Sequence, residues 1–416
     1  MVQETNWIES LPLQSHHIME RLTRRGHEVR VIDFEARWRR EGQSNPFTSH
    51  LFSNVQRTDP TSSVCLIRPG MLRVPGLGRL SSIPSQFKVI FEQIAQWCDV
   101  VVLYSVPTNG VMTLLLSKLI DKPVLFHSFD VLHRMTGNSF LLSPTWAFER
   151  FVYPRVSKVV VISPSLKRYM ETIGVSSSDI VMLPPAVNTT MFNPGNSGDR
   201  FRGEQGISDD DKIVLFSGWL YEFSGLDTIL RDLSCMVDDF PNMKLVICGD
   251  GPLLPKLQAM QKKFELEDQV KILGRRPYGQ MPTIIASADV CINPYLPDIR
   301  SKFAFPSKIA EYMASGKAVI STDLPGTSSM LGSKSGVLLV TSSDFMGALK
   351  KVLANDEWRE TSGRDCRRFC EEHFSLDAVV STFESILMEL VRNRRSSTFL
   401  TENRHIDRTE EAILAN

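Results

Sequence analysis

Apolar runs of strand length alternate with amphipathic stretches almost throughout the chain, and this alternation most constrains how the chain can fold. The runs are rich in Val, Ile and Leu and do not alternate in polarity, which is typical of strands covered on both faces. In the first half they are residues 28–34, 63–67, 99–105, 123–128, 157–163 and 179–184. Helical patterns separate them, such as residues 14–25, which end at Gly26. The pattern predicts an α/β fold in which helices cover both faces of a parallel sheet.

The alternation occurs twice, which predicts two similar doubly wound domains. Residues 193–212 are rich in Gly, Asn and Asp and read as a linker. Beyond them, strands are expected at 212–218, 243–249, 269–274, 289–294, 317–321 and 336–340. The predicted boundaries are a domain over 1–192, a linker over 193–211, a second domain over 212–373, a helix over 374–395 that packs back across both domains, and a disordered tail over 396–416. We expect the two domains to face each other across a cleft.

Composition excludes several classes of function. Lys plus Arg and Asp plus Glu both total 47 of the 416 residues, so no global field favours nucleic acid. The seven cysteines are odd in number and irregularly spaced, which favours a reduced, cytoplasmic compartment and no metal site. No apolar run reaches the ~18 residues of a membrane-spanning helix. The start shows no signal-peptide pattern, and its apolar run is only half a strand long, so the first strand is short or begins upstream.

Ligand sites of doubly wound sheets form at the carboxyl ends of the strands, so the residues there are the first candidates. Gly218 ends one strand and would let the chain pass close to a ligand, although a plain turn needs the same residue. Gly251 suits a tight turn and would also admit a flat ligand. Arg275 and Arg276 follow the strand at 269–274, where they meet either a phosphate or only solvent.

A helix that begins at Pro306 carries an unusual first turn. Ser307 and Lys308 lie where backbone N–H groups are unpaired and the helix dipole is positive, so a lysine is unfavourable there unless an anion binds. Glu311 lies one turn further on, so that cation, hydroxyl and carboxylate are expected to face one spot. The carboxylate could accept hydrogen bonds from a diol such as ribose. The alternative is an intrahelical Lys308–Glu311 pair worth only ~0.3 kcal/mol.

Several separated motifs resemble one known family. They are "VVVISPSLKRYMETIGV" (159–175), "VNTTMFNP" (187–194), "CGDGPLLPKL" (248–257), "ILGRRPYGQMPTIIASADVCINP" (272–294) and "PSKIAEYMASGKAVISTDLPG" (306–326). In this order they are similar to the retaining glycosyltransferases of family 4, over about residues 1–390. The resemblance implies the GT-B architecture of two Rossmann-like domains, with the acceptor bound by the first and a nucleotide-diphosphate sugar by the second. It also implies transfer with retained anomeric configuration and without a metal or other cofactor.

The resemblance assigns roles to individual residues. Glu311 matches the glutamate that holds the nucleotide ribose, and residues 275–279 lie where the base-contacting loop begins. Asp130 matches an acceptor-side aspartate, next to a position where the family has His and this chain has Phe129. The residues that depart from the family's donor site are Phe303 for a glutamate beside the sugar, and Trp219 and Ser224 for the Arg and Lys that bind the diphosphate. The glycine-rich loop after the first strand is also missing. Lys308 is therefore predicted to be the main cation for the diphosphate and, with Asp130, a catalytic residue.

Three functions remain open at this point. The first is an active sugar transferase that uses a lipid-linked or cell-surface glycan precursor. Its basic, apolar stretch 66–91, which carries Arg68, Arg73, Arg79 and Lys88, would contact the inner face of a membrane, or else simply cover the sheet. The second is a catalytically weak or inactive binding subunit of the same fold, which the three lost donor contacts favour. The third is a phosphorylase or epimerase of the same fold, which no specific residue in the sequence indicates.

Overall fold

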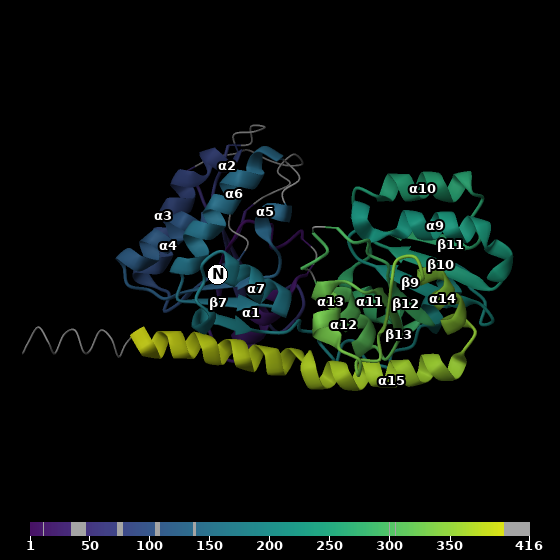
Figure 1. Cartoon of the computed structure of the whole chain (residues 1–416). Coiled ribbons are helices and arrows are strands. Elements are labelled where there is room, and N and C mark those ends of the chain that lie inside the picture. Colours follow the sequence, from purple (N-terminus) through teal and green to yellow (C-terminus); the bar gives the residue numbers. More distant parts are fainter. Residues whose placement is uncertain are drawn as a thin grey trace, which may run out of the picture. The chain divides into compact units, whose positions relative to one another are not determined.

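The computed structural model describes residues 1–10, 12–34, 47–72, 78–104, 109–135, 139–298, 300–303 and 305–394, and all structural statements concern these. The chain divides into two compact units, each built around its own sheet (Figure 1). The first unit contains residues 1–161, 167–183 and those from 380 onward; the second contains 162–166 and 184–379. The predicted tail 396–416 lies outside the described residues.

The first unit holds an eight-stranded sheet in the order β3-β4-β2-β1-β5-β6-β7-β8. Its strands are β1 (Val2–Gln3), β2 (Arg30–Ile32), β3 (His50–Val55), β4 (Val64–Arg68), β5 (Val101–Tyr104), β6 (Val124–Ser128), β7 (Lys158–Val161) and β8 (Ile180–Met182). All neighbours pair in parallel except β3 with β4. Each strand predicted here is confirmed. The edge strand β3 was missed because none of its side chains is buried, so it leaves no apolar run.

Helices surround this sheet, and the last described helix packs against it. They are α1 (Gln14–Arg24), α2 (Gly78–Ser81), α3 (Ile83–Gln96), α4 (Gly110–Leu119), α5 (Leu132–Met135), α6 (Ser139–Val152) and α7 (Pro164–Thr172). Residues 376–394 form a further helix, which starts in the second unit and belongs to the first from Val380 onward. There Phe383 packs on the His127 ring at 5.4 Å, and Glu384 pairs with Arg25 at 2.7 Å. No helix among the described residues is long and apolar enough to cross a membrane.

The loop after β1 lacks glycine and is instead closed by packing and charge. Trp7 is fully buried and stacks on His16, with ring centroids 3.9 Å apart. Asp33, whose side chain is fully buried, accepts a hydrogen bond from the Trp7 N–H and pairs with Arg68 through bonds of 2.9 and 2.7 Å. The loop that replaces the expected glycine-rich one is therefore fixed by a buried ion pair.

The second unit holds six parallel strands in the order β11-β10-β9-β12-β13-β14. These are β9 (Lys212–Ser217), β10 (Met243–Cys248), β11 (Val270–Gly274), β12 (Val290–Asn293), β13 (Ala318–Thr322) and β14 (Leu338–Val340). Every strand predicted for this half is confirmed. The order is the doubly wound one, in which a ligand binds where the strand order reverses, here between β9 and β12.

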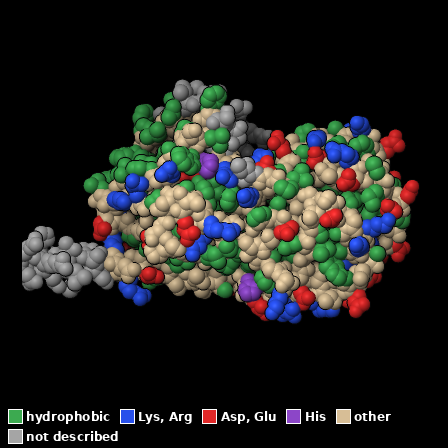
Figure 2. Space-filling model, viewed as in Figure 1, with side chains coloured by type: hydrophobic (Ala, Val, Ile, Leu, Met, Phe, Trp, Pro, Cys, Tyr) green, Lys and Arg blue, Asp and Glu red, His purple; other side chains and the backbone are tan. Residues whose placement is uncertain are grey.

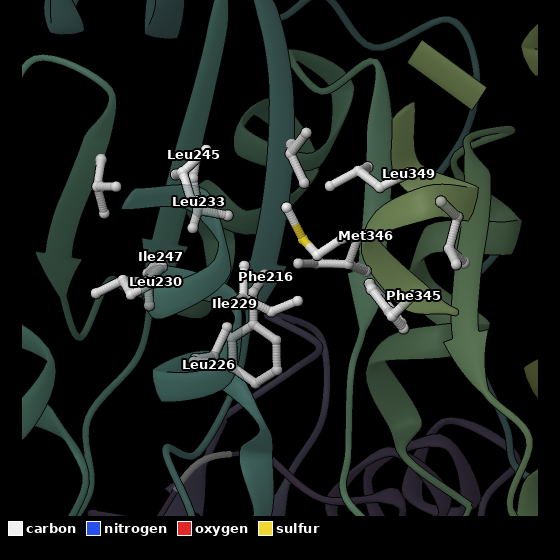
Figure 3. Close-up of a cluster of buried hydrophobic side chains, with 14 of the residues drawn as sticks. Phe216, Leu226, Ile229, Leu230, Leu233, Leu245, Ile247, Phe345, Met346 and Leu349 are labelled. Atoms are coloured by element: carbon white, nitrogen blue, oxygen red, sulfur yellow. The ribbon is translucent and has the colours of Figure 1, made fainter. Parts of the chain in front are cut away.

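Eight α-helices of this unit lie within the described chain. They are α8 (Asp199–Gln205), α9 (Leu226–Cys235), α10 (Leu254–Lys263), α11 (Met281–Ala286), α12 (Ser307–Ala314), α13 (Pro325–Leu331), α14 (Phe345–Leu353) and α15 (Asp356–His373). Figure 3 shows how α9 and α14 bury their apolar side chains against the strands, with Phe216 of β9 between them. Because such burial contributes ~1.5–3 kcal/mol for each large side chain, this core fixes the strand ends that form the site.

The stretch 193–211 differs from the linker that the sequence predicted. It contains α8 and lies inside the second unit. Phe201 is buried, and Arg202 donates hydrogen bonds to the Asp289 carboxylate at 2.9 Å and to the Ser287 carbonyl at 3.1 Å. Phe201 and Arg202 thus hold this segment against the rest of the second unit, although its overall composition is that of a loop.

Candidate functional site

The carboxyl ends of β9, β10 and β11 meet through glycines. The Gly218 N–H donates to the Cys248 carbonyl at 2.9 Å, and the Gly249 N–H donates to the Gly274 carbonyl at 2.9 Å. A Cβ on Gly251, whose φ is +151°, would lie only 2.6 Å from the Leu220 carbonyl oxygen. Backbone contact therefore explains Gly251 without any ligand.

Gly218 has a different neighbour. Its φ is +129°, and a Cβ there would lie 3.0 Å from Cε and 3.1 Å from Nζ of Lys308. The glycine at the end of β9 thus makes room for the lysine that starts α12. The structure brings together two residues that the sequence placed 90 positions apart.

Lys308 is a buried cation in the first turn of α12. Only 6% of it is exposed, and its Nζ lies 3.6 Å from the centre of the Phe216 ring and 4.6 Å from that of Tyr295. The Nζ also donates a hydrogen bond to the Tyr295 hydroxyl at 3.2 Å. Ring faces attract an ammonium ion, but neither ring neutralises its charge. Burial lowers the pKa of Lys308 well below its usual value, and the nearby Glu311 acts against this shift.

Lys308 and Glu311 do not form the close pair that would explain the lysine structurally. No carboxylate of the described residues makes an ion pair with Lys308. The Glu311 carboxylate instead accepts a hydrogen bond from the Tyr278 hydroxyl at 3.2 Å. Burial raises the pKa of Glu311 to about 7, against the lowering effects of Tyr278 and Lys308. The site therefore holds an amine and a carboxyl group that are both shifted toward their neutral forms, as expected of groups that await a ligand.

The remaining predicted donor residues are placed differently. Ser307 is exposed, whereas the neighbouring Lys308 is buried, so the two side chains do not share one environment. Arg275 is exposed. Arg276 is half-buried, its Nε is buried without a hydrogen-bond partner in the described structure, and its charge lowers the pKa of the Cys248 thiol, which burial raises to about 12. Arg276 is thus a second cation at the same edge of the sheet.

The three departures from the family pattern offer no substitute charge. Trp219 and Phe303 are half-buried, and the Phe303 carbonyl accepts a hydrogen bond from the Ser163 hydroxyl at 3.4 Å. Ser224 is fully buried, and its hydroxyl has no partner among the described residues. The cations described at this edge include Lys308 and the two arginines after β11. Arg300, in the loop after β12, is held by the Asp298 carboxylate through hydrogen bonds of 2.9 and 3.2 Å.

Asp130 lies in the first unit, just after β6. Burial raises the pKa of its carboxyl group to about 6. That carboxyl group makes no hydrogen bond or ion pair with the described residues, and only the backbone oxygen accepts one, from Ser128 at 3.2 Å. Phe129 packs on Tyr104 and His127, with centroids 5.1 and 4.3 Å apart. Asp130 is thus an unneutralised carboxylate at the end of a strand.

Sequence reasoning missed the aromatic surroundings of the site. Phe216 lies within an apolar run and cannot be told there from a core residue. Tyr295 is the second residue after β12, near the point where the strand order reverses, and this position could have indicated it. Tyr278 lies in the loop that carries the arginines, yet only the structure shows its bond to Glu311.

Known protein families match both halves of the chain. Residues 198–368 match the family model "Glycosyl transferases group 1", and residues 13–186 match "Glycosyl transferase 4-like domain". A phosphatidylinositol N-acetylglucosaminyltransferase subunit from Arabidopsis thaliana is 28% identical over 182 residues, 44% of this chain and 38% of that protein. D-inositol 3-phosphate glycosyltransferase from Corynebacterium glutamicum is 26% identical over 226 residues, 51% of this chain and 52% of that protein. The chain therefore matches only about half, or less, of the length of these relatives.

Solved structures resemble the whole described fold. HepE from Anabaena, in complex with UDP and glucose, has a TM-score of 0.70 at 15% identity and covers 93% of this chain and 98% of its own. Sucrose-phosphate synthase from Thermosynechococcus elongatus has a TM-score of 0.73 at 15% identity, covering 94% and 98%. The predicted α/β fold with two Rossmann-like units is confirmed. Together with the two family models, this likeness shows that the chain belongs to the glycosyltransferases of the family 4 type, with the GT-B fold.

Proposed function

We propose that this glycosyltransferase takes its sugar from a uridine-diphosphate sugar, with Lys308 and the N-terminus of α12 holding the diphosphate. The observation that carries the proposal is the buried Lys308 ammonium, which has two ring faces and no carboxylate partner among the described residues. A helix N-terminus with free N–H groups is an anion site, and it lies here next to the strand-order reversal. The complex of HepE with UDP supports the choice of nucleotide.

The chemistry we propose is transfer with retained configuration. The bond between the sugar C1 and the diphosphate oxygen breaks, and the diphosphate leaves with the electron pair. The acceptor hydroxyl forms the new bond to C1 on the face from which the diphosphate departs, and it gives up its proton to the departing diphosphate oxygen. Lys308 would stabilise the charge that develops on the leaving diphosphate. Asp130 is the proposed acceptor-side carboxylate, and its pKa of about 6 leaves it mostly ionised above pH 7. Charge neutralisation by Lys308 and backbone N–H groups would need no metal.

The acceptor we propose is an inositol-containing or other lipid-linked glycan precursor. Support comes from the relatives, whose names refer to phosphatidylinositol and to inositol 3-phosphate. Because the matches cover about half of those proteins or less, the acceptor class is a proposal for this chain.

The test is a transfer assay with UDP-glucose and UDP-N-acetylglucosamine against inositol 3-phosphate and phosphatidylinositol. Mass spectrometry should detect a glycosylated product, proton NMR of its anomeric signal should report retention, and excess EDTA should leave the rate unchanged. Absence of any product, together with no effect of UDP on the melting temperature, would overturn the proposal.

A second candidate function is a binding subunit without catalysis. The observation that favours it is the loss of charge at Trp219, Ser224 and Phe303. In that case UDP would raise the melting temperature, yet no sugar would be transferred to any acceptor, and hydrolysis of the UDP-sugar would also be absent.

Glu311→Gln should weaken UDP binding with little change in the free energy of unfolding. A carboxylate accepts hydrogen bonds about twice as strongly as a neutral group, so the ribose hydroxyls would lose part of their attraction. Since burial raises the pKa of Glu311 to about 7, wild-type affinity should fall as the pH drops from 8 to 6, because the carboxyl group becomes protonated. The Glu311→Gln variant should lack this pH-dependent loss of UDP affinity, because its amide does not titrate. Titration calorimetry at several pH values measures the UDP affinity and its pH dependence. Protonation of the UDP phosphate affects the wild type and the variant equally, so it cancels when the two proteins are compared. Equal affinities and equal pH profiles would remove Glu311 from the site.

Tyr278→Phe tests whether Tyr278 positions Glu311. The hydroxyl donates to the carboxylate and lowers the pKa of Glu311, so its removal should raise that pKa further. The loss of UDP affinity on acidification should then begin at a higher pH than in the wild type. A merely structural role of Tyr278 would lower the melting temperature and leave the pH profile in place.

A further inference from the structure

The first unit exposes an unusual number of large apolar side chains. On α3, Ile83, Phe87 and Phe91 recur every four residues, and all three are at least 40% exposed. Others project from α2, α4 and α6: Leu80, Leu115, Leu119, Phe140, Leu141, Leu142, Trp146 and Phe151. Among the described residues, the second unit exposes no large apolar side chain to this degree.

These side chains belong to one connected group of helices. α2 packs beside α3, α3 beside α4, and α4 beside α6. Figure 2 shows hydrophobic side chains, with Lys and Arg between them, over the part of the first unit where Figure 1 labels these helices. We call the exposed side of α2, α3, α4 and α6 the apolar face. Its extent exceeds the scattered apolar residues of an ordinary surface.

The exposed charges on the apolar face all have one sign. Its exposed charged residues in the described structure are Arg79, Lys88, Lys118 and Arg150. The two acids of these helices do not balance them: Glu92 is half-buried, and Glu149 is buried in bonds to His133 and Tyr169.

Aromatic side chains of α6 accompany cations on and just after that helix. The Arg150 guanidinium lies 4.9 Å from the Trp146 ring, and that of Arg155 lies 4.6 Å from the Phe151 ring. Amphipathic rings and basic side chains that carry an apolar stem are typical of surfaces at the boundary between lipid and water.

We propose that the apolar face binds the surface of an anionic lipid bilayer. A basic, apolar face complements negatively charged headgroups and the acyl boundary beneath them. A second copy of this chain is a poor occupant, because a symmetric contact would bring the same cations together. The proposal rests on the proposed function for its purpose, since a lipid-linked acceptor lies at such a surface.

The apolar face corrects and extends the predicted membrane region 66–91. Arg68 is not available there, because it pairs with the buried Asp33. Arg79 is partly engaged by Glu4 at 3.2 Å, and Arg73 lies outside the described residues. α4 and α6 enlarge the surface, and nothing in the stretch 66–91 by itself could indicate them.

The test is cosedimentation of the full chain with vesicles of phosphatidylserine and phosphatidylcholine, or of phosphatidylcholine alone. Binding should require phosphatidylserine and weaken at high salt. Lys88→Gln/Lys118→Gln should lower the partition coefficient by about 25-fold, because each basic residue near the surface contributes about fivefold, equivalent to ~1 kcal/mol. Phe140→Ser/Leu141→Ser should lower it as well. The matched control is Lys262→Gln/Lys263→Gln, which removes two exposed cations from α10 of the second unit and should change binding far less.

Three results would overturn the proposal: no binding to either vesicle, equal losses for the control and the face variants, or a dimer in solution that Phe140→Ser/Leu141→Ser dissociates. The melting temperature with UDP is measured for every variant and separates the two proposals. Loss of vesicle binding with an intact response to UDP confirms the apolar face alone as the membrane site. A missing UDP response with intact vesicle binding counts against the proposed function instead.

Discussion

Lys308→Ala should weaken UDP binding by more than about tenfold and leave uridine binding nearly unchanged. In the free protein the Lys308 side chain is buried over Phe216 and beside the Tyr295 hydroxyl, so its amino group is already desolvated before an anion arrives. Removing one partner of a desolvated charge pair typically costs ~2–5 kcal/mol, and tenfold corresponds to only ~1.4 kcal/mol. Titration calorimetry with UDP and with uridine measures the difference.

Proton uptake on UDP binding is a second measurement that tests whether Lys308 contacts the diphosphate. Burial lowers the pKa of Lys308 in the free protein, and a bound diphosphate would raise it. At a pH between these two pKa values UDP binding should take up a proton. The affinity for UDP should therefore fall as the pH rises from the pKa of the free protein to that of the complex, and level off above it. The measured binding enthalpy should therefore depend on the ionisation enthalpy of the buffer. Lys308→Met keeps the packing on the rings and should abolish this contribution.

Arg275→Ala and Arg276→Ala are the competing variants. Should either of them abolish UDP binding while Lys308→Ala binds normally, the arginines after β11 carry the phosphate. Arg276 is the stronger rival because its Nε is buried without a partner among the described residues.

Arg68→Met should lower the free energy of unfolding by ~3–5 kcal/mol, because it leaves a buried charge uncompensated. The Asp33 side chain is fully buried, only 12% of Arg68 is exposed, and two hydrogen bonds join them. The Trp7 N–H depends on the same carboxylate, so the loop after β1 should loosen as well. Denaturant unfolding measures the stability, and hydrogen exchange of the Trp7 amide follows the loop.

Two further variants sharpen this prediction. Asp33→Asn/Arg68→Met removes both charges and keeps an acceptor for Trp7, so it should recover part of the lost stability. Arg200→Met removes an exposed helical pair with Glu204 at 2.7 Å and should cost under about 1 kcal/mol. If Arg68→Met costs no more than Arg200→Met, the ion pair does not hold the loop.

The sequence alone determined the strands and their helices, because a strand buried on both faces must be apolar along its whole length. It therefore predicted every strand of the second unit. It also marked Lys308, since a lysine in a first helical turn opposes the helix dipole. Features that leave no apolar run were missed, such as the exposed strand β3, and α8 was misread as a linker because two side chains dock it.

Only the tertiary structure decided what surrounds each candidate residue. Phe216, Gly218, Tyr295 and Lys308 come from three segments, and folding of the sheet brings them to one point. The same folding leaves the Ser307 side chain exposed while it buries that of Lys308. It also places Arg68 in an ion pair with Asp33. The apolar face likewise consists of side chains from four helices between residues 78 and 152, and the sequence of no single helix indicates that face. Periodicity along a chain reports which side of an element is buried, but the neighbours across a packed interface are set by the three-dimensional path of the backbone.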